Sequence, residues 1–316
     1  MKKGSKIGIA AAVILALAGM TGCNSTSQKN DGADSQISSA GKSSETSTTD
    51  QTEFKVGDVL EAKGLKIVYV ASGEYVSDQF KQPAEGKKYI RAEFYCENIS
   101  ESDKNFSEFD FECFAGGAPC EQVYPGGGEL SATLSPGRST SGSVYFEVPE
   151  DAADIQLEYG TDSPNDQKVF FVYEGEKDSG FVPEANSCSA GSAFAVGDVA
   201  ETETMRISYL SCGEHTSDNE FVQPAEGKHF IYCEFEFENI SDSDQLVSVY
   251  DFDCFADGTS CNASYAEKDE LSATLSAGRK TQGKVYFEVP ADAENVEIEY
   301  VDDSVKSERL VFAYQP

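Results

Sequence analysis

Short runs in which apolar and polar residues alternate dominate the chain from residue 54 onward. The segment 87–98 places four apolar residues, Ile90, Ala92, Phe94 and Cys96, on one face of an extended chain and charged residues on the other. This alternation predicts a half-buried strand, because successive side chains of a strand point to opposite sides. The same pattern predicts further strands at 65–71, 109–114, 142–148, 155–159 and 168–173. Without helical periodicity, six or seven such strands predict an all-β sandwich.

The pattern occurs twice in the chain. Phe54 to Asp58 returns at 194–198, and Gln82 to Lys87 returns at 223–228. The offset is 140 residues at the first motif and 141 from the second onward, so the second copy has one inserted residue, either Asn219 or Glu220. We therefore expect two tandem immunoglobulin-like antiparallel β-sandwiches. Their predicted ranges are 54–174 and 194–316, joined by a linker at 175–193.

The first 53 residues read as a secretion and attachment segment. Three lysines precede an apolar run from Ile7 to Met20, which is typical of a signal peptide and short for a membrane span. The run ends in Met20-Thr21-Gly22-Cys23, which resembles a lipobox. We expect residues 1–22 to be removed and Cys23 to be acylated. The alternative is a soluble secreted protein with one spare thiol. Residues 23–53, rich in Ser and Thr, predict a disordered tether.

Charge and composition narrow the possible functions. The formal net charge is −32 and becomes −35 without residues 1–22, which hold three lysines and no acidic residue. Such a chain repels nucleic acid. His215 and His229 fall at positions that have no histidine in the first copy, and no phosphate-binding motif is present. We therefore predict no enzyme and no cofactor.

Several motifs carry a resemblance to a known family. They are Val56-Gly57-Asp58, the turn 83–87 before the strand that ends at 97–100, Asp110-Phe111, and Gly142 followed by Phe146 and Pro149. In both copies they resemble the family catalogued as domain of unknown function 4352. The resemblance implies an immunoglobulin-like sandwich, similar to mycobacterial secreted immunoprotective antigens and typically displayed on Gram-positive lipoproteins. It brings no catalytic residues, and without tryptophan any kinship with antibodies is architectural.

Two cysteine pairs stand at equivalent positions. If Gly116-Gly117 and Asp257-Gly258 form two-residue hairpin turns, Cys113 lies opposite Cys120 and Cys254 lies opposite Cys261. Hydrogen-bonded cross-strand positions lie about 5.5 Å apart, within reach of a disulfide. We predict a disulfide in each hairpin, and two reduced thiols in each domain are the alternative.

The other cysteines leave more than one interpretation open. Cys96 aligns with Phe237 and Cys233 with Ala92, which favours packed core thiols. Cys212 and Cys233 are both missing from the first copy, and this joint absence hints at a bond between them. Cys188 lies in the predicted linker and either pairs with Cys96 or stays free.

Carboxylates and aromatic residues supply the remaining candidate sites. If Asp110 with Glu112, and Asp251 with Asp253, project from one strand face, each pair is a possible start of a calcium site. The expected interpretation is a solvated acidic face and no metal. A separate set of aromatic residues stands in loops: Phe80, Phe221, Tyr124 and Tyr265. Phe80 and Phe221 either cap the open end of the sandwich or act as exposed ligand contacts, and the two tyrosines raise the same question.

These features predict a lipid-anchored module at the extracellular face of the cytoplasmic membrane, on a Gram-positive cell surface. It is expected to bind an extracellular protein or glycan, and its only membrane contact is the anchor at Cys23. A calcium-dependent structural or sensor protein is the alternative.

Overall fold

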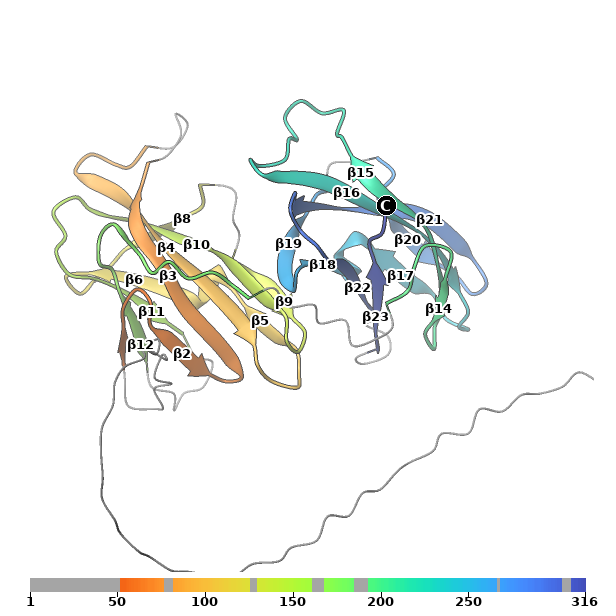
Figure 1. Cartoon of the computed structure of the whole chain (residues 1–316), viewed down its shortest axis with the longest axis horizontal. Helices are drawn as coiled ribbons and strands as arrows, with labels where there is room; N and C mark the ends of the chain where they lie inside the picture. The colour runs from red at the N-terminus through yellow and green to blue at the C-terminus, as the bar shows by residue number, and fades with distance from the viewer. Residues whose placement is uncertain are drawn as a thin grey trace, which may run out of the picture. The chain divides into compact units, whose positions relative to one another are not determined.

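The computed structural model describes residues 52–76, 82–125, 130–160, 168–184, 193–265, 268–302 and 308–316. The predicted signal segment, Cys23 and the predicted tether up to residue 51 lie outside this range, as do Phe80 and Cys188. Within the described residues, no helix is long and apolar enough to cross a membrane. The helical elements there are two 3₁₀ turns, and the fold is all-β (Figure 1).

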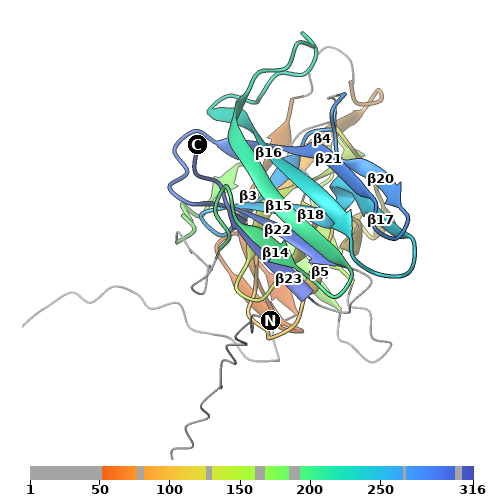
Figure 2. The same ribbon diagram turned by 90° about the vertical axis from the view of Figure 1, so that its right-hand side faces the viewer.

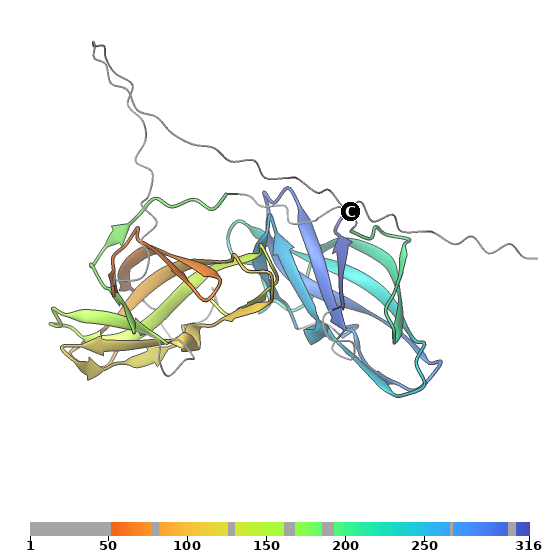
Figure 3. The ribbon, with the colours of Figure 1, turned by 90° about the horizontal axis from the view of Figure 1, so that it is seen from below.

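The first domain is a two-layer sandwich (Figure 3). One sheet has the order β13-β3-β4-β10, with β2 and β8 paired at its sides, and the other has the order β1-β12-β11-β6-β7. The elements are β1 (Glu53–Phe54), β2 (Val59–Ala62), β3 (Leu65–Tyr75), β4 (Lys87–Asn98), β5 (Lys104–Phe106), η1 (Glu108–Asp110), β6 (Phe111–Ala115), β7 (Ala118–Pro119), β8 (Glu121–Val123), β9 (Ala132–Leu134), β10 (Ser139–Pro149), β11 (Ile155–Tyr159), β12 (Val169–Val172) and β13 (Lys177–Asp178).

The second domain repeats this plan. Strands β14, β15 and β16 run side by side in Figure 2, and β16 pairs with β21 on its other side. In the other layer β22 lies between β18 and β23 and pairs with both. The elements are β14 (Val199–Glu201), β15 (Met205–His215), β16 (Lys228–Asn239), β17 (Gln245–Ser248), η2 (Val249–Asp251), β18 (Phe252–Ala256), β19 (Thr259–Ala263), β20 (Ser272–Leu275), β21 (Lys280–Pro290), β22 (Val296–Asp302) and β23 (Glu308–Ala313). The prediction of two tandem sandwiches is confirmed.

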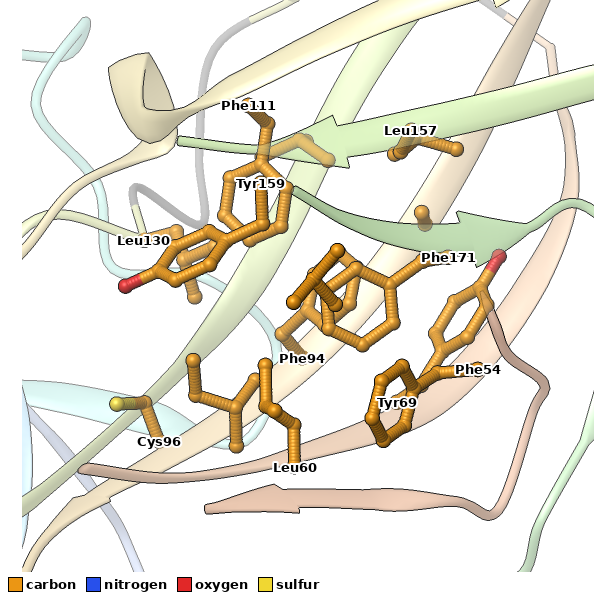
Figure 4. Close-up of a cluster of buried hydrophobic side chains, with 14 of the residues drawn as sticks. Phe54, Leu60, Tyr69, Phe94, Cys96, Phe111, Leu130, Leu157, Tyr159 and Phe171 are labelled. Atoms are coloured by element: carbon orange, nitrogen blue, oxygen red, sulfur yellow. The ribbon is translucent and has the colours of Figure 1, made fainter. Parts of the chain in front are cut away.

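Aromatic rings fill the centre of each sandwich. In the first domain Tyr69 stacks on Phe94 at 4.9 Å between ring centroids, and Phe171 meets Phe94 edge-on at the same distance (Figure 4). The equivalent rings of the second domain, Tyr209 and Phe235, also stack at 4.9 Å. Full burial of each such side chain contributes about 1.5 to 3 kcal/mol. The predicted core face of β4 is confirmed, because its four apolar residues are at most 1% exposed.

Strand limits differ from the prediction where side chains compete for the backbone. The segments 87–98 and 155–159 are strands over the predicted ranges. The strand predicted from Phe109 begins instead at Phe111, because Ser107 starts a 3₁₀ turn. Part of the predicted linker pairs with the first domain. Its first part forms β13, where Lys177 pairs with Ser72 on β3, and Ser72 Oγ donates to the carbonyl of Gly175 at 2.7 Å.

Candidate functional site

An exposed pair of aromatic rings recurs at the same place in both domains. Phe109 in η1 and Tyr124 after β8 lie 5.8 Å apart between ring centroids, with 68% and 45% of their surfaces exposed. Their equivalents in the second domain, Tyr250 and Tyr265, lie 5.1 Å apart and are 76% and 51% exposed. We call these two surfaces the aromatic pairs. Tyr124 and Tyr265 were predicted, whereas Phe109 and Tyr250 were missed.

One ring of each aromatic pair lies in a capped 3₁₀ turn. In the first domain the Ser107 amide donates to Asp110 Oδ2 at 2.9 Å, and the Phe109 amide donates to Ser107 Oγ at 3.2 Å. Ser248 and Asp251 repeat this reciprocal capping box around Tyr250. Such a box satisfies backbone donors that the short turn leaves free, and so fixes its direction. The motif Ser-x-x-Asp before a strand was the signal in the sequence that could have revealed these turns.

The same turns show that the expected arrangement of the carboxylate pairs is wrong. Asp110 and Asp251 lie in the 3₁₀ turns and accept the capping hydrogen bonds, so they do not share a strand face with Glu112 and Asp253. Asp257, the nearest acidic residue of the following hairpin turn, accepts hydrogen bonds from two backbone amides of the loop before β22. Over the described residues, no group of three or more His, Cys, Asp or Glu side chains is placed to hold a metal ion.

Asp253 is more buried than Glu112, the equivalent residue of the first domain. Burial, followed by the repulsion of Glu299, raises the pKa of Asp253 to about 6. The guanidinium of Arg309 opposes this rise in pKa. Glu112 at the equivalent place is exposed. The two carboxylates therefore do not form a repeated site.

Phe221 does not cap its sandwich. Its side chain is 88% exposed, and its amide donates to Asn219 Oδ1 at 3.1 Å in the loop before β16. The inserted residue of the second copy falls in this loop. Because Phe80 lies outside the described residues, the structure does not show a repeated ring at this position.

The cysteine register is as predicted. Gly116 and Gly117 have φ values of 57° and 81°, and the Cys120 amide donates to the Cys113 carbonyl at 2.8 Å. In the second domain Cys254 pairs directly with Cys261. Positive φ at both turn residues is typical of the type I′ hairpin, which brings the flanking positions face to face. The sulfur atoms are thiols in this structure, and their oxidation stays a prediction.

A third cross-strand pair joins Cys212 and Cys233. The two residues are register partners on β15 and β16. Cys233 is fully buried, and its sulfur lies 3.2 Å from the Tyr209 hydroxyl. Burial raises the pKa of Cys233 to about 12, so this thiol is protonated at neutral pH. Cys96 has no such partner opposite it, because Ile67 and Thr140 pair with it on either side in the first-domain core.

A buried arginine links the first domain to the second domain of the chain, and sequence reasoning missed it. Arg138, before β10, is 2% exposed, and its Nε and Nη2 lie 2.8 and 2.7 Å from Glu299 Oε1 on β22. Its Nη1 also lies 2.7 Å from Glu297 Oε2, at ion-pair distance. The guanidinium sits 4.5 Å from the centre of the Phe255 ring. We call this set the arginine clasp.

Hydrogen bonds surround the arginine clasp. Ser135 Oγ donates to Glu299 Oε2 at 3.0 Å, and the Ser139 amide donates to the Gly258 carbonyl at 3.0 Å. Arg309 makes a bidentate contact with Asp103, with both distances 3.0 Å. Charge-assisted and bidentate hydrogen bonds are among the strongest polar contacts in proteins. The clasp is therefore a specific contact in which the arginine and both carboxylates are paired.

One family model matches the chain twice, once in each domain. The family described as Domain of unknown function (DUF4352) matches residues 45–169 and 194–310. No curated protein matches the chain.

Similar solved structures include ycdA, described as a lipoprotein of Bacillus subtilis, at 14% identity and a TM-score of 0.32. That match covers 37% of this chain, and this chain spans 38% of ycdA. A β-sandwich protein from Clostridium difficile has 12% identity and a TM-score of 0.27, covering 39% of this chain and 95% of that one. MPT63, a secreted protein of Mycobacterium tuberculosis, has 16% identity and a TM-score of 0.30, covering 40% and 100%.

Proposed function

The chain belongs to the family described as Domain of unknown function (DUF4352), and from that premise we propose that it is a non-enzymatic extracellular binding module. A lipid on Cys23 holds it at the outer face of the cytoplasmic membrane of a Gram-positive cell. The aromatic pairs make the contact with a protein or glycan outside the cell. The acidic remainder of the surface keeps the module soluble and repels polyanions.

The repetition of the aromatic pairs is the observation that carries this proposal. Large exposed apolar side chains are common singly, but here two rings meet in each domain, and a capped turn fixes one of them. Aromatic side chains supply large contact area at a low cost in conformational entropy, which makes them frequent anchors of interfaces. Neither ring of a pair is needed to fill the core.

Two equivalent surfaces on one chain allow bivalent binding. If a target presents the same group repeatedly, as a polymer does, engagement of one aromatic pair raises the effective concentration of the other. Such linkage raises apparent affinity by about 10² to 10⁴ when geometry allows both contacts. A repeated envelope glycan or a repetitive surface protein fits this arrangement better than a small soluble ligand.

A pull-down with matched variants tests the binding surface. Soluble protein of residues 24–316 carrying Phe109→Ser and Tyr250→Ser is compared with wild type on cell-envelope and host extracts. Val76→Ser with Leu246→Ser is the control, because these side chains are 90% and 67% exposed and lie outside the aromatic pairs. We expect the first variant to lose the captured partner and the control to keep it. Equal capture by both variants, or no capture by wild type, contradicts the proposal.

The anchor has a separate test. Cells that express the full chain are labelled with a radioactive fatty acid, and membrane and medium are compared. Wild type is expected to carry label and to fractionate with the membrane, whereas Cys23→Ser is expected to be unlabelled. Label that persists in Cys23→Ser contradicts acylation at this residue.

A further inference from the structure

The arginine clasp joins two unlike surfaces. The first domain contributes the turn before β10, with Arg138 and Ser135, together with Asp103 before β5. The second domain contributes the outer face of β18 and β22, with Phe255 and Glu299. We call these the donor end and the acceptor face. A contact of this kind between two copies of one fold is heterologous, so it uses a different surface on each copy and does not close on itself.

Because the domains are copies, each carries both surfaces. At the repeat offset of 141, the second domain has its own donor end with Arg279, Ser276 and Asp244. All three of these side chains are exposed, whereas Arg138 is only 2% exposed. The difference arises because Arg138 lies against an acceptor face, whereas no such face covers Arg279 among the described residues.

The first domain likewise has its own acceptor face. Phe114 corresponds to Phe255, Glu158 to Glu299, and Lys168 to Arg309. Lys168 forms an ion pair with Glu158 as Arg309 does with Glu299. Phe114 is half-buried, whereas Phe255 under the arginine is 1% exposed.

We propose that the donor end around Arg279 binds the acceptor face around Glu158 on a second copy of this chain, so that the molecules associate head to tail. The guanidinium of Arg279 then pairs with Glu158 and lies over the ring of Phe114. Each added molecule presents a fresh donor end, so the association propagates. This association requires neither the aromatic pairs nor a lipid anchor.

The contact between chains is weaker than the clasp within the chain. Gln156 replaces Glu297, so one of the two carboxylates is missing. Lys280 replaces Ser139, whose amide and hydroxyl contact Gly258 and Thr259. Within one chain, the linker keeps each domain at an effective concentration in the millimolar range near the other, which favours the clasp. Separate molecules do not have this advantage. We therefore expect association at roughly 0.1 to 1 mM in solution and at lower bulk concentration on a crowded surface.

Sedimentation velocity on residues 24–316, from about 10 µM to about 1 mM at physiological salt, tests the proposal across the expected association range. This range of residues contains both packed cores. Wild type is expected to sediment faster as concentration rises, without a plateau at a dimer. Arg279→Glu is expected to stay monomeric, and Lys268→Glu, an exposed site with the same charge change, is expected to behave as wild type. A wild type that stays monomeric at the highest concentration, or equal association of the two variants, overturns the proposal.

A mixing experiment tests the pairing itself. Glu158→Arg alone is expected to be monomeric, because Arg279 then meets a second guanidinium on the next molecule. An equimolar mixture with Arg279→Glu is expected to recover at least half of the wild-type association, because that mixture again brings opposite charges together. Glu184→Arg is the matched charge control for the acceptor variant. If Glu158→Arg unfolds at a lower temperature than wild type, the sedimentation of Arg279→Glu still tests whether the donor end mediates association, because that side chain is exposed. Absence of recovery between two folded variants refutes the pairing of Arg279 with Glu158.

Discussion

We expect replacement of Arg138 by alanine to uncouple the two domains. Among the described residues, Arg138 is the only cation paired with Glu297, and its loss leaves Arg309 as the only cation paired with Glu299. Loss of one partner from a buried ion pair costs about 3 to 5 kcal/mol, because the remaining charge stays desolvated. In this chain the carboxylates regain water if the domains separate. The cost is therefore limited to the free energy of the contact, and both sandwiches stay folded.

Hydrogen exchange at Ser139 measures the effect. Its amide donates to the Gly258 carbonyl of the other domain, so its protection reports the contact directly. If the substitution weakens the contact between the domains by about 3 kcal/mol, the Ser139 amide should exchange roughly 100-fold faster. Each 1.4 kcal/mol corresponds to a factor of about ten in the equilibrium between the closed and open contact. Protection in β16 at the centre of the second domain is expected to stay unchanged, because that strand lies between β15 and β21.

Arg279→Ala is the matched control. It removes the same residue type from the equivalent turn, but its side chain is exposed. Exposed substitutions of this kind change stability by about 0.5 kcal/mol or less. At low micromolar concentration, Ser139 protection is therefore expected to match wild type. Unchanged protection in Arg138→Ala, or an equal loss in Arg279→Ala, would refute the reasoning.

Three further predictions concern stability. Burial raises the folded-state pKa of Asp253 to about 6, above the ordinary value of an aspartate in the unfolded chain. Ionisation of this carboxyl therefore destabilises the folded protein progressively from about pH 4 to about pH 6, and to the full extent above that range. Asp253→Asn should therefore be more stable than wild type by about 1 to 3 kcal/mol at about pH 8, and this advantage should vanish towards about pH 4 in denaturant titrations. A gain independent of pH would contradict the assignment. Oxidation of Cys113 with Cys120 should give a disulfide-linked peptide by mass spectrometry and stabilise its hairpin domain by about 2 to 3 kcal/mol over the reduced form. Free thiols in protein purified without reductant would contradict it. Asn98 is fully buried and donates hydrogen bonds to two backbone carbonyls, at 2.8 and 2.7 Å. Asn98→Ala should therefore lower the free energy of unfolding by about 2 to 4 kcal/mol, because both carbonyls lose their partner. A decrease below about 1 kcal/mol would show that water replaces the amide at those carbonyls.

The repeat, the strands and the hairpin register could be predicted because their signals are local. Alternation fixes which face of β4 is buried, and a two-residue turn between Cys113 and Cys120 fixes which residues face each other. The 3₁₀ turns were also local, but their signal is a polar motif that competes with strand formation. Alternation alone therefore predicts that Phe109 belongs to a strand, whereas it lies in a capped turn.

The arginine clasp could not be predicted in the same way. Arg138 and Arg279 stand in the same local sequence, Ser-x-Gly-Arg, yet one is buried and the other exposed. The difference depends on which surface of the other domain meets each turn, and neighbouring residues carry no information about that. The aromatic pairs present an intermediate case, because the predicted tyrosines find their partner rings only through the pairing of β8 with β10 and of β19 with β21.

The proposed binding function rests on the aromatic pairs, and its most direct test is a quantitative binding series on purified cell envelope. Wild type, Phe109→Ser, Tyr250→Ser and the double variant are compared at equal concentration, after each is shown to melt as wild type does. Each single variant is expected to lose at least about tenfold in apparent affinity because bivalent contact is broken, and the double variant is expected to lose binding altogether. Four proteins that bind alike would contradict the claim that these rings form the contact surface.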